Sequence, residues 1–299
     1  MNTDDTKSPG GETPADRSPM TWFTSGIDST QDAGLAAGGV ARVLGDSVSL
    51  PYMSIYFSDR QIALDCGSYR RYQEQKRRKR KAPITEQDAR QYAAMHPGRK
   101  FAFRIAMDVI GDAATTMLFW NNIFHNADYP HGQPFVPVYT WGAPHEHLQQ
   151  YLEQAPYIPA LGTNLVCLGG LAPILRGGHR VTDAEEKAKK EDARKAALKG
   201  VLHLCERYPK RFHILGLNHL DAIDQLRHLL ASADASKWLD GRRYGYVFFY
   251  DSRTHKLRYA PSGALTSPAL KQFADYTTNQ RLTHNAKIIA HWAETPRIN

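Results

Sequence analysis

Short apolar runs alternate with stretches of helical periodicity along the chain from Thr21 onward. Apolar runs of strand length lie at residues 53–57, 61–67, 101–111, 134–142, 164–171 and 211–218. Helical patterns lie at residues 85–95, 144–153, 183–207 and 220–230. Such alternation predicts parallel βα units, and this number of units favours an α/β fold of the (β/α)8 TIM-barrel type. A doubly wound sheet is the alternative, because periodicity does not reveal whether a sheet closes.

The two ends of the chain differ in pattern from its middle. Residues 1–19 are rich in Pro, Gly, Asp and Thr and have no periodic apolar face, which predicts a disordered leader. Near the other end, the apolar run at residues 244–251 predicts a further strand or a hairpin with residues 256–260. We therefore expect a single barrel domain over residues 20–299.

Composition narrows the class of partner. The chain has 38 Lys and Arg against 30 Asp and Glu, a formal net charge of +8, which favours a polyanion such as nucleic acid. The three cysteines, Cys66, Cys167 and Cys205, are far apart and odd in number, so a reducing cytoplasm fits better than a disulfide framework. The sequence shows neither an apolar signal segment nor an apolar run long enough to cross a membrane.

Polar or glycine residues follow several of the predicted strands. The segments are LDCGSY, AMDVIGD, YTWG, CLGGL and LGLN, and the first two carry Asp65 and Asp108. A buried carboxylate without a partner is costly, so an aspartate at such a position has a reason to lie at an open end of the sheet. In a TIM-type barrel the carboxyl ends of the strands hold the chemistry. The pattern therefore predicts a site built from strand ends.

The order of LDCGSY, AMDVIG, CLGGL, HILGLN and SADAS resembles that of the tRNA-guanine transglycosylases. Those enzymes have an aspartate in a DSGG-like turn, an aspartate after an apolar strand, an IGGL strand, an MGVG strand and a final FD aspartate. The resemblance spans residues 53–238 of this chain. The matching residues are Asp65, Asp108, Gly169, Gly170, Leu171, Gly216 and Asp234.

Within that superfamily, the chain looks more like the DpdA proteins of bacteria and phages, which insert a 7-deazaguanine into DNA. The SxDxSxW signature supports this, with Ser232, Asp234, Ser236 and Trp238. The tRNA enzymes carry a structural zinc site of cysteines and a histidine after the last aspartate, whereas this chain has no cysteine after Cys205. We therefore expect no zinc subdomain, and DNA in place of tRNA.

The resemblance implies a role for each matching residue that fits the chemistry of base exchange. Cleavage of an N-glycosidic bond builds oxocarbenium-like charge on the sugar, and a carboxylate such as Asp234 stabilises that charge and then bonds to C1′. Asp65 protonates the leaving guanine and deprotonates the incoming base. Asp108 accepts hydrogen bonds from the guanine edge, and Gly169 and Gly170 let a base lie close to the backbone. No cofactor or metal is implied.

Each aspartate also has a structural explanation, because Asp is a common cap of helices and turns. Asp65 could cap the turn before Gly67, Asp108 a helix at residues 110–119, and Asp234 a helix at residues 237–241. Agreement with the family order favours the catalytic interpretation.

Two further features are candidate contacts. Tyr139 and Trp141 follow a strand and could stack on a base or pack in the core. Residues 70–81 hold eight basic residues and one acid, and could follow a phosphate backbone or form a solvated loop. The basic residues assigned to nucleic-acid binding are Arg70, Arg71, Lys76, Arg77, Arg78, Lys79 and Arg80.

We expect an enzyme, a glycosyltransferase that exchanges guanine in DNA for a 7-deazaguanine of the preQ0 type through a covalent aspartyl-nucleotide intermediate. Its expected partners are DNA, the free deazaguanine base and a helicase-like protein that opens the duplex. The alternatives are a tRNA-guanine transglycosylase, a non-catalytic nucleic-acid-binding barrel subunit, and a basic nuclease or nucleotide-binding protein. Both Asp65 and Asp234 are present, which argues against a degenerate subunit, and no P-loop or dinucleotide fingerprint supports the last class.

Overall fold

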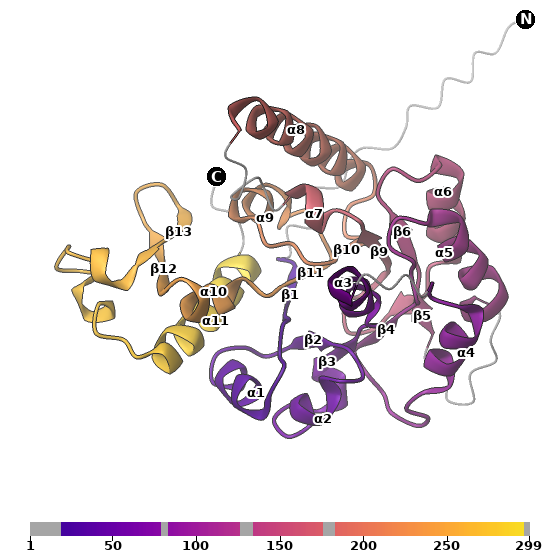
Figure 1. Cartoon of the computed structure of the whole chain (residues 1–299), viewed down its shortest axis with the longest axis horizontal. Helices are drawn as coiled ribbons and strands as arrows, with labels where there is room; N and C mark the ends of the chain where they lie inside the picture. Colours follow the sequence, from indigo (N-terminus) through magenta and orange to yellow (C-terminus); the bar gives the residue numbers. More distant parts are fainter. Residues whose placement is uncertain (1–18, 79–82, 126–133, 176–182, 296–299) are drawn as a thin grey trace, which may run out of the picture.

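In the part of the chain that the structure describes, nine strands form one parallel sheet that closes nearly into a barrel (Figure 1). The computed structural model describes residues 19–78, 83–125, 134–175 and 183–295, so the predicted leader, except Pro19, lies outside the described residues. The strands are β1 (Thr21–Thr24), β2 (Val43–Gly45), β3 (Ile62–Leu64), β4 (Phe103–Ile105), β5 (Phe135–Val136), β6 (Val138–Thr140), β9 (Val166–Gly169), β10 (Phe212–Ile214) and β11 (Ser232–Ala235).

The ring closes through a single stretch of chain. The strand order is β5-β4-β3-β2-β1-β11-β10-β9-β6, so β5 and β6 are the two edges of the sheet. Only Pro137 separates these two strands, and its carbonyl oxygen accepts a hydrogen bond from Cys167 N at 2.8 Å. Because β5 pairs with β4 and β6 pairs with β9, the sheet is TIM-barrel-like.

Helices surround the ring because parallel strands need crossover connections, and helices occupy most of them (Figure 1). They are α1 (Thr30–Ala37), α2 (Leu50–Met53), α3 (Ser68–Arg78), α4 (Glu86–Ala94), α5 (Ala113–Phe119), α6 (His145–Gln154), α7 (Ala172–Leu175), α8 (Ala184–Arg207), α9 (Leu220–Leu226), α10 (Asp240–Arg243) and α11 (Thr278–Glu294). Two small antiparallel sheets lie outside the ring: β7 (Tyr157–Ile158) with β8 (Thr163–Asn164), and β12 (Tyr246–Asp251) with β13 (Lys256–Pro261). In the described part of the chain, no helix is long and apolar enough to cross a membrane.

Side chains of the strands alternate between the barrel interior and the surrounding helices. On β3, Ala63 belongs to an inner apolar cluster, whereas Leu64 belongs to the larger cluster shared with the helices. Rings of Phe23 and Phe103 lie 5.3 Å apart, and those of Phe103 and His213 also 5.3 Å apart. These residues are on β1, β4 and β10, which are not neighbours in the sheet, so their contacts cross the interior. The interior is filled, as in other small barrels.

The helix α11 fastens the start of the barrel and the hairpin to each other. Glu294 Oε1 accepts a hydrogen bond from Trp22 N on β1 at 3.0 Å. The buried Asn285 accepts from Phe248 N at 3.0 Å and donates to Tyr246 O at 2.9 Å. Both backbone groups of the hairpin are thereby satisfied inside the packed region, which fixes the hairpin against α11.

Most of the predicted elements are present. Asp183 caps α8 by accepting from Glu186 N at 2.8 Å, and the predicted hairpin is β12 with β13. The strand predicted at residues 53–57 is wrong, because these residues form the end of α2 and the turn after it. The reason is Pro51, which suits the first turn of a helix, and the following Ile55 is 59% exposed. The sequence pattern also missed β1, β2 and β11.

Candidate active site at the carboxyl ends of the barrel strands

Three aspartates predicted from the sequence gather at one end of the barrel. Asp65 directly follows β3, Asp108 lies three residues after β4, and Asp234 is the third residue of β11. These are carboxyl ends of parallel strands, which meet at one mouth in this architecture. The charges of Asp108 and Asp234 both raise the pKa of Asp65, so the three groups interact electrostatically.

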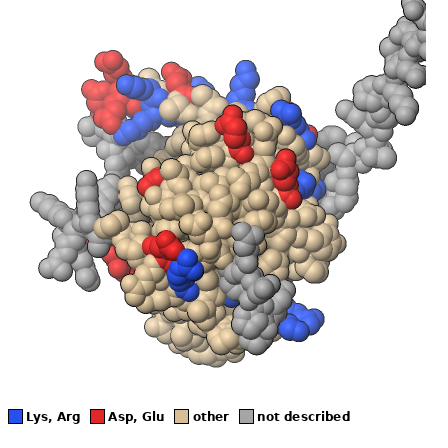
Figure 2. Space-filling view, turned by 90° about the vertical axis from the view of Figure 1, so that its right-hand side faces the viewer, with Lys and Arg blue, Asp and Glu red and all other residues tan. Residues whose placement is uncertain are grey.

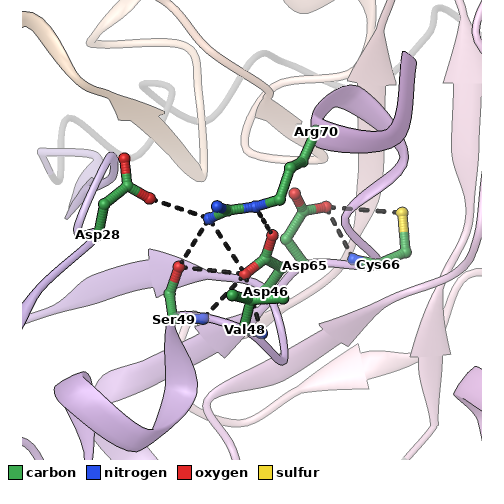
Figure 3. Close-up of polar contacts among 7 residues, drawn as sticks. All are labelled: Asp28, Asp46, Val48, Ser49, Asp65, Cys66 and Arg70. Atoms are coloured by element: carbon green, nitrogen blue, oxygen red, sulfur yellow. Dashed lines mark hydrogen bonds and ion pairs between the residues drawn. The ribbon is translucent and has the colours of Figure 1, made fainter. Parts of the chain in front are cut away.

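The thiol of Cys66 lies between two of these carboxylates. Its Sγ atom is 3.6 Å from Asp65 Oδ1, and the Cys66 amide donates to the same oxygen at 2.8 Å (Figure 3). The same Sγ atom is 3.4 Å from Asp108 Oδ1. Ser68 Oγ contacts the same sulfur at 3.1 Å and donates to Asp108 O at 2.7 Å. Burial raises the pKa of the thiol well above its usual value, and the two carboxylates add to this effect. Cys66 is therefore a protonated thiol that joins Asp65 to Asp108.

Asp65 is the carboxyl group with the proton affinity that acid–base catalysis at neutral pH requires. Burial first, and then the charges of Asp108, Asp234 and Asp46, raise its pKa to about 7, while the Cys66 amide works in the other direction. Burial also raises the pKa of Asp108, and the hydrogen bonds from Cys66 and Ser68 oppose that rise. A carboxyl group that titrates near neutral pH can both give and take a proton.

Asp234 is buried, and hydrogen-bond donors face one of its two oxygens. Its side chain is 5% exposed. Gly216 N donates to Asp234 Oδ1 at 2.9 Å, and His213 Nε2 lies 3.4 Å from the same atom. Gly216 has a φ of +67°, a conformation that suits glycine, so the turn after β10 can aim its N–H at the carboxylate.

The capping explanation fits only one of the three aspartates. Asp112 caps α5 by accepting from Thr115 N at 2.9 Å, so Asp108 does not cap that helix. Asp234 lies within β11, and the short helix that follows begins after Ser236. Asp65 does accept a hydrogen bond from the next amide, which is a local turn contact. The turn contact leaves its raised pKa unexplained, because that bond lowers the pKa.

The glycines predicted to contact a base differ in their surroundings. A Cβ atom on Gly169 would lie 3.7 Å from Asp108 Oδ2 and only 2.9 Å from the Val138 side chain, so glycine is needed here for the strands to pack. Gly170 has a φ of +77°, which any other residue would strain. Leu171 is fully buried in the cluster shared with the helices, so its side chain does not face the aspartates.

Tyr139 and Trp141 do not lie with the aspartates. Both line a pocket of about 220 Å³ between α6 and α8, together with His145 and Arg207. The Tyr139 hydroxyl donates to Ala143 O at 2.7 Å, which turns the ring away from the barrel axis. The alternation of β6 explains this placement, since Tyr139 belongs to the outer cluster. The prediction that these two residues stack on a base at the mouth is therefore not supported by their position.

The two described arginines of the basic run are paired with carboxylates. Arg70 Nε donates to Asp46 Oδ2 at 2.5 Å and its Nη2 to Asp28 Oδ1 at 2.9 Å (Figure 3), and Arg71 Nη1 lies 2.9 Å from Asp88 Oδ1. Both arginines thus form ion pairs within the protein. The side chains of Lys76, Arg77 and Arg78, and the whole of Lys79 and Arg80, lie outside the described residues.

Charge is mixed on the face that carries α4, α5 and α6. Figure 2 shows scattered Lys and Arg side chains on this face, several beside Asp or Glu, with uncharged surface between them. Among the described residues, no group of three or more His, Cys, Asp or Glu is arranged to hold a metal ion. The described part of this face therefore shows no continuous basic surface.

Sequence reasoning missed two residues close to the site, Asp46 and His213, and gave no role to Ser232 of the SxDxSxW signature. Asp46 follows β2 and its charge raises the pKa of Asp65, while its carboxylate accepts from Ser49 N at 3.0 Å and Ser49 Oγ at 3.1 Å. His213 and Ser232 lie beside Asp234 in the barrel interior. Asp46 had a sequence signal, because it follows the short run VLG just as Asp65 follows IAL.

No model of a known protein family matches the chain, and no curated protein is similar to it in sequence.

Proposed function

We propose that this protein is a base-exchange transglycosylase of the tRNA-guanine transglycosylase type, with DNA as its polymer and a 7-deazaguanine as its incoming base. The observation that carries the proposal is the meeting of Asp65, Asp108 and Asp234 at one mouth. On this proposal β5 and β6 count as one strand interrupted by Pro137, and the ring is a (β/α)8 barrel without a zinc-binding subdomain.

Asp65 acts as the general acid and then the general base. A pKa of about 7 means that a large fraction of the group is protonated at neutral pH. The protonated form gives its proton to the leaving guanine as the glycosidic bond breaks. The resulting carboxylate then takes a proton from the incoming base, which restores the starting state.

Asp234 acts as the nucleophile that forms a covalent bond to C1′ of the sugar. Its oxygen Oδ1 is held by Gly216 N–H, which fixes the plane of the carboxylate without engaging its other oxygen. A fixed carboxylate beneath an oxocarbenium-like sugar stabilises the developing positive charge before it bonds. The neighbouring Asp65 and Asp234 then have different roles because their surroundings differ.

Asp108 and the backbone at Gly169 receive the base. Asp108 Oδ2 lies 3.7 Å from the position that a Cβ atom of Gly169 would take, so a base bound to this carboxylate would lie near that stretch of backbone. Guanine and its 7-deaza analogues offer adjacent N–H donors to a carboxylate. A base without those donors would leave Asp108 unpaired, which is the basis for rejecting it.

The polymer is proposed as DNA because the chain has no cysteine after Cys205 from which a zinc subdomain could be built. A base within a duplex is inaccessible to Asp234, so the substrate is single-stranded or flipped DNA. A net charge of +8 suits either polymer, and so the choice between DNA and tRNA is made by experiment.

The test is an exchange assay on DNA and tRNA side by side. Purified protein is incubated with radiolabelled guanine or preQ0 and with single-stranded DNA, duplex DNA or tRNA. We expect label to enter DNA, a covalent protein–DNA adduct to be trapped, and Asp234→Ala to form no adduct. Label entering only tRNA would replace the proposed polymer, and no label entering either polymer with a folded protein would refute the catalytic proposal.

Asp275→Ala is the matched control variant for that assay. Asp275 is exposed and lies between α10 and α11, away from the mouth. Its loss also removes one negative charge, so any effect of charge alone on DNA binding appears in both variants. We expect the control to form the adduct as the unmodified protein does.

A further inference from the structure

His213 is a fully buried histidine beside Asp234. It lies on β10 with no exposed surface, and its ring is flanked by Phe103 at 5.3 Å and Phe23 at 6.0 Å between ring centres. Its Nδ1 atom is 2.8 Å from Ser232 Oγ, and its Nε2 atom is 3.4 Å from Asp234 Oδ1. In the described part of the chain, Nε2 has no hydrogen-bond partner. A buried polar atom of this kind calls for an explanation.

Strand register places these three side chains together. His213 on β10 pairs directly with Ser232 on β11, and Asp234 lies two residues further along the same strand. Side chains two apart on a strand point to the same side, so Ser232 and Asp234 both face the barrel interior, where His213 also lies. The arrangement follows from the sheet and does not depend on a loop.

The groups that face the two ring nitrogens of His213 determine which nitrogen carries the proton. A serine hydroxyl can donate to Nδ1, and Nε2 then carries the N–H. The acceptor that faces Nε2 is Asp234 Oδ1, and a small movement of either side chain brings 3.4 Å to hydrogen-bond length. The opposite tautomer would point a lone pair of Nε2 at a carboxylate oxygen in an apolar interior, which is unfavourable.

We propose that His213, oriented by Ser232, is a positioning residue that donates its Nε2–H to Asp234 Oδ1. Together with Gly216 N–H, it occupies Oδ1 with two donors and leaves Oδ2 as the oxygen that attacks C1′. This inference rests on the proposed function. As the bond from Oδ2 to C1′ forms, the glycosidic bond breaks, its electron pair stays on the guanine, and the guanine takes the proton of Asp65.

The same donors assist the second half of the exchange. In the ester formed at Oδ2, Oδ1 is the carbonyl oxygen and still accepts from His213 and Gly216. When the incoming base attacks C1′, the electron pair of the C1′–Oδ2 bond returns to the carboxylate, and negative charge grows on Oδ1. Fixed donors at the atom where charge appears stabilise that transition state.

The tautomer can be measured directly and needs no activity. The protein is labelled with 15N-histidine, and long-range 1H–15N spectra report which ring nitrogen carries the proton. The His213 signals are assigned as those that vanish in His213→Gln. We expect an Nε2–H ring whose signals move in Asp234→Asn. An Nδ1–H ring donating to Ser232, with bare Nε2, would overturn the inference.

Kinetics of adduct formation test the role in the reaction. His213→Leu removes both nitrogens, and we expect it to lower kcat by about tenfold to a hundredfold with little change in KM for the base, as for loss of one hydrogen bond to a charged group. His213→Gln keeps an N–H near the position of Nε2, and we expect it to recover most of the rate. If His213 were only structural, His213→Gln would not recover the rate. A His213→Gln rate as low as that of His213→Leu would therefore refute the positioning role.

His284→Leu is the matched control. His284 Nε2 also makes one hydrogen bond of 2.8 Å, which it donates to Phe248 O, but it lies on α11 beside the hairpin. If the unmodified protein exchanges no base, the proposed function fails, and the tautomer measurement still decides the placement of the His213 proton. If exchange occurs and His213→Leu keeps its full rate, only the inference on His213 fails.

Discussion

The raised pKa of Asp65 should make the site destabilising at neutral pH, and this can be tested without a substrate. We compare the unmodified protein with Asp65→Asn, which has nearly the same shape and does not titrate. Below pH 3.8 the Asp65 carboxyl is protonated in both the folded and the unfolded protein and adds no penalty. Between 3.8 and about 7 it ionises only in the unfolded chain, so stability falls as the pH rises.

The size of the effect follows from the two pKa values. A change from 3.8 to about 7 corresponds to about 4 kcal/mol, at about 1.4 kcal/mol for each tenfold change in the proton-binding constant. Above pH 7 the full penalty remains, because Asp65 is then ionised beside Asp108 and Asp234. We therefore expect Asp65→Asn to be more stable than the unmodified protein at pH 8, and the advantage to be small at pH 4.

The measurement is urea unfolding followed by circular dichroism at pH 4, 6 and 8. The free-energy difference between Asp65→Asn and the unmodified protein should grow with pH by up to about 4 kcal/mol. Asp275→Asn, at an exposed position, should show no such growth and serves as the control. A difference that stays constant from pH 4 to pH 8 would refute the reasoning that burial and the neighbouring carboxylates hold a proton on Asp65.

Three further predictions concern rate and stability. The rate of guanine exchange should fall as the pH rises above about 7, because Asp65 then loses the proton that the leaving base needs; a rate that is flat from pH 6 to pH 9 would contradict its role as the acid. Gly216→Ala should lower the free energy of unfolding by about 1–2 kcal/mol, because the φ of Gly216 is +67°. It should also slow adduct formation, and equal rates in the two proteins would show that the hydrogen bond from Gly216 to Asp234 does not assist the reaction. Arg70→Met should lower the free energy of unfolding in urea by about 1–3 kcal/mol, because it leaves the 9%-exposed Asp46 carboxylate without its cation. An unchanged free energy of unfolding would show that solvent replaces the pair.

The sequence pattern was sufficient for the strands with continuous apolar runs. Residues 164–171 and 211–218 were predicted as strands and contain β9 and β10. The strand β11 was missed because its sequence is SADA, in which two of four residues are polar. Those polar residues face the interior near the mouth, where function and not apolar packing determines the side chain. Strand patterns are therefore weakest where the site is.

The site itself was predictable only in part. Asp65 and Asp108 follow apolar strands, and the end of a parallel strand is a position that the chain order reveals. The contact of His213 with Ser232 joins residues 19 apart in sequence through the register of two strands, and no local pattern encodes that register. For Tyr139, a local pattern was present and was not used. Alternation along residues 138–140 places Tyr139 on the outer side of the barrel, opposite to Val138.

The hydrogen bond between Trp22 and Glu294 joins residues 272 positions apart, and the ladder between β1 and β11 spans nearly as much of the chain. During translation, therefore, Asp65 and Asp108 leave the ribosome long before β11, the second partner strand of β1, has been made. Contacts of such long range are slow to form, because the loop between them must first close. The three carboxylates can meet only after β11 has been made, so a shorter nascent chain does not contain the complete charge cluster. The contribution of Asp234 to the raised pKa of Asp65 thus arises only once β11 can pair with β1.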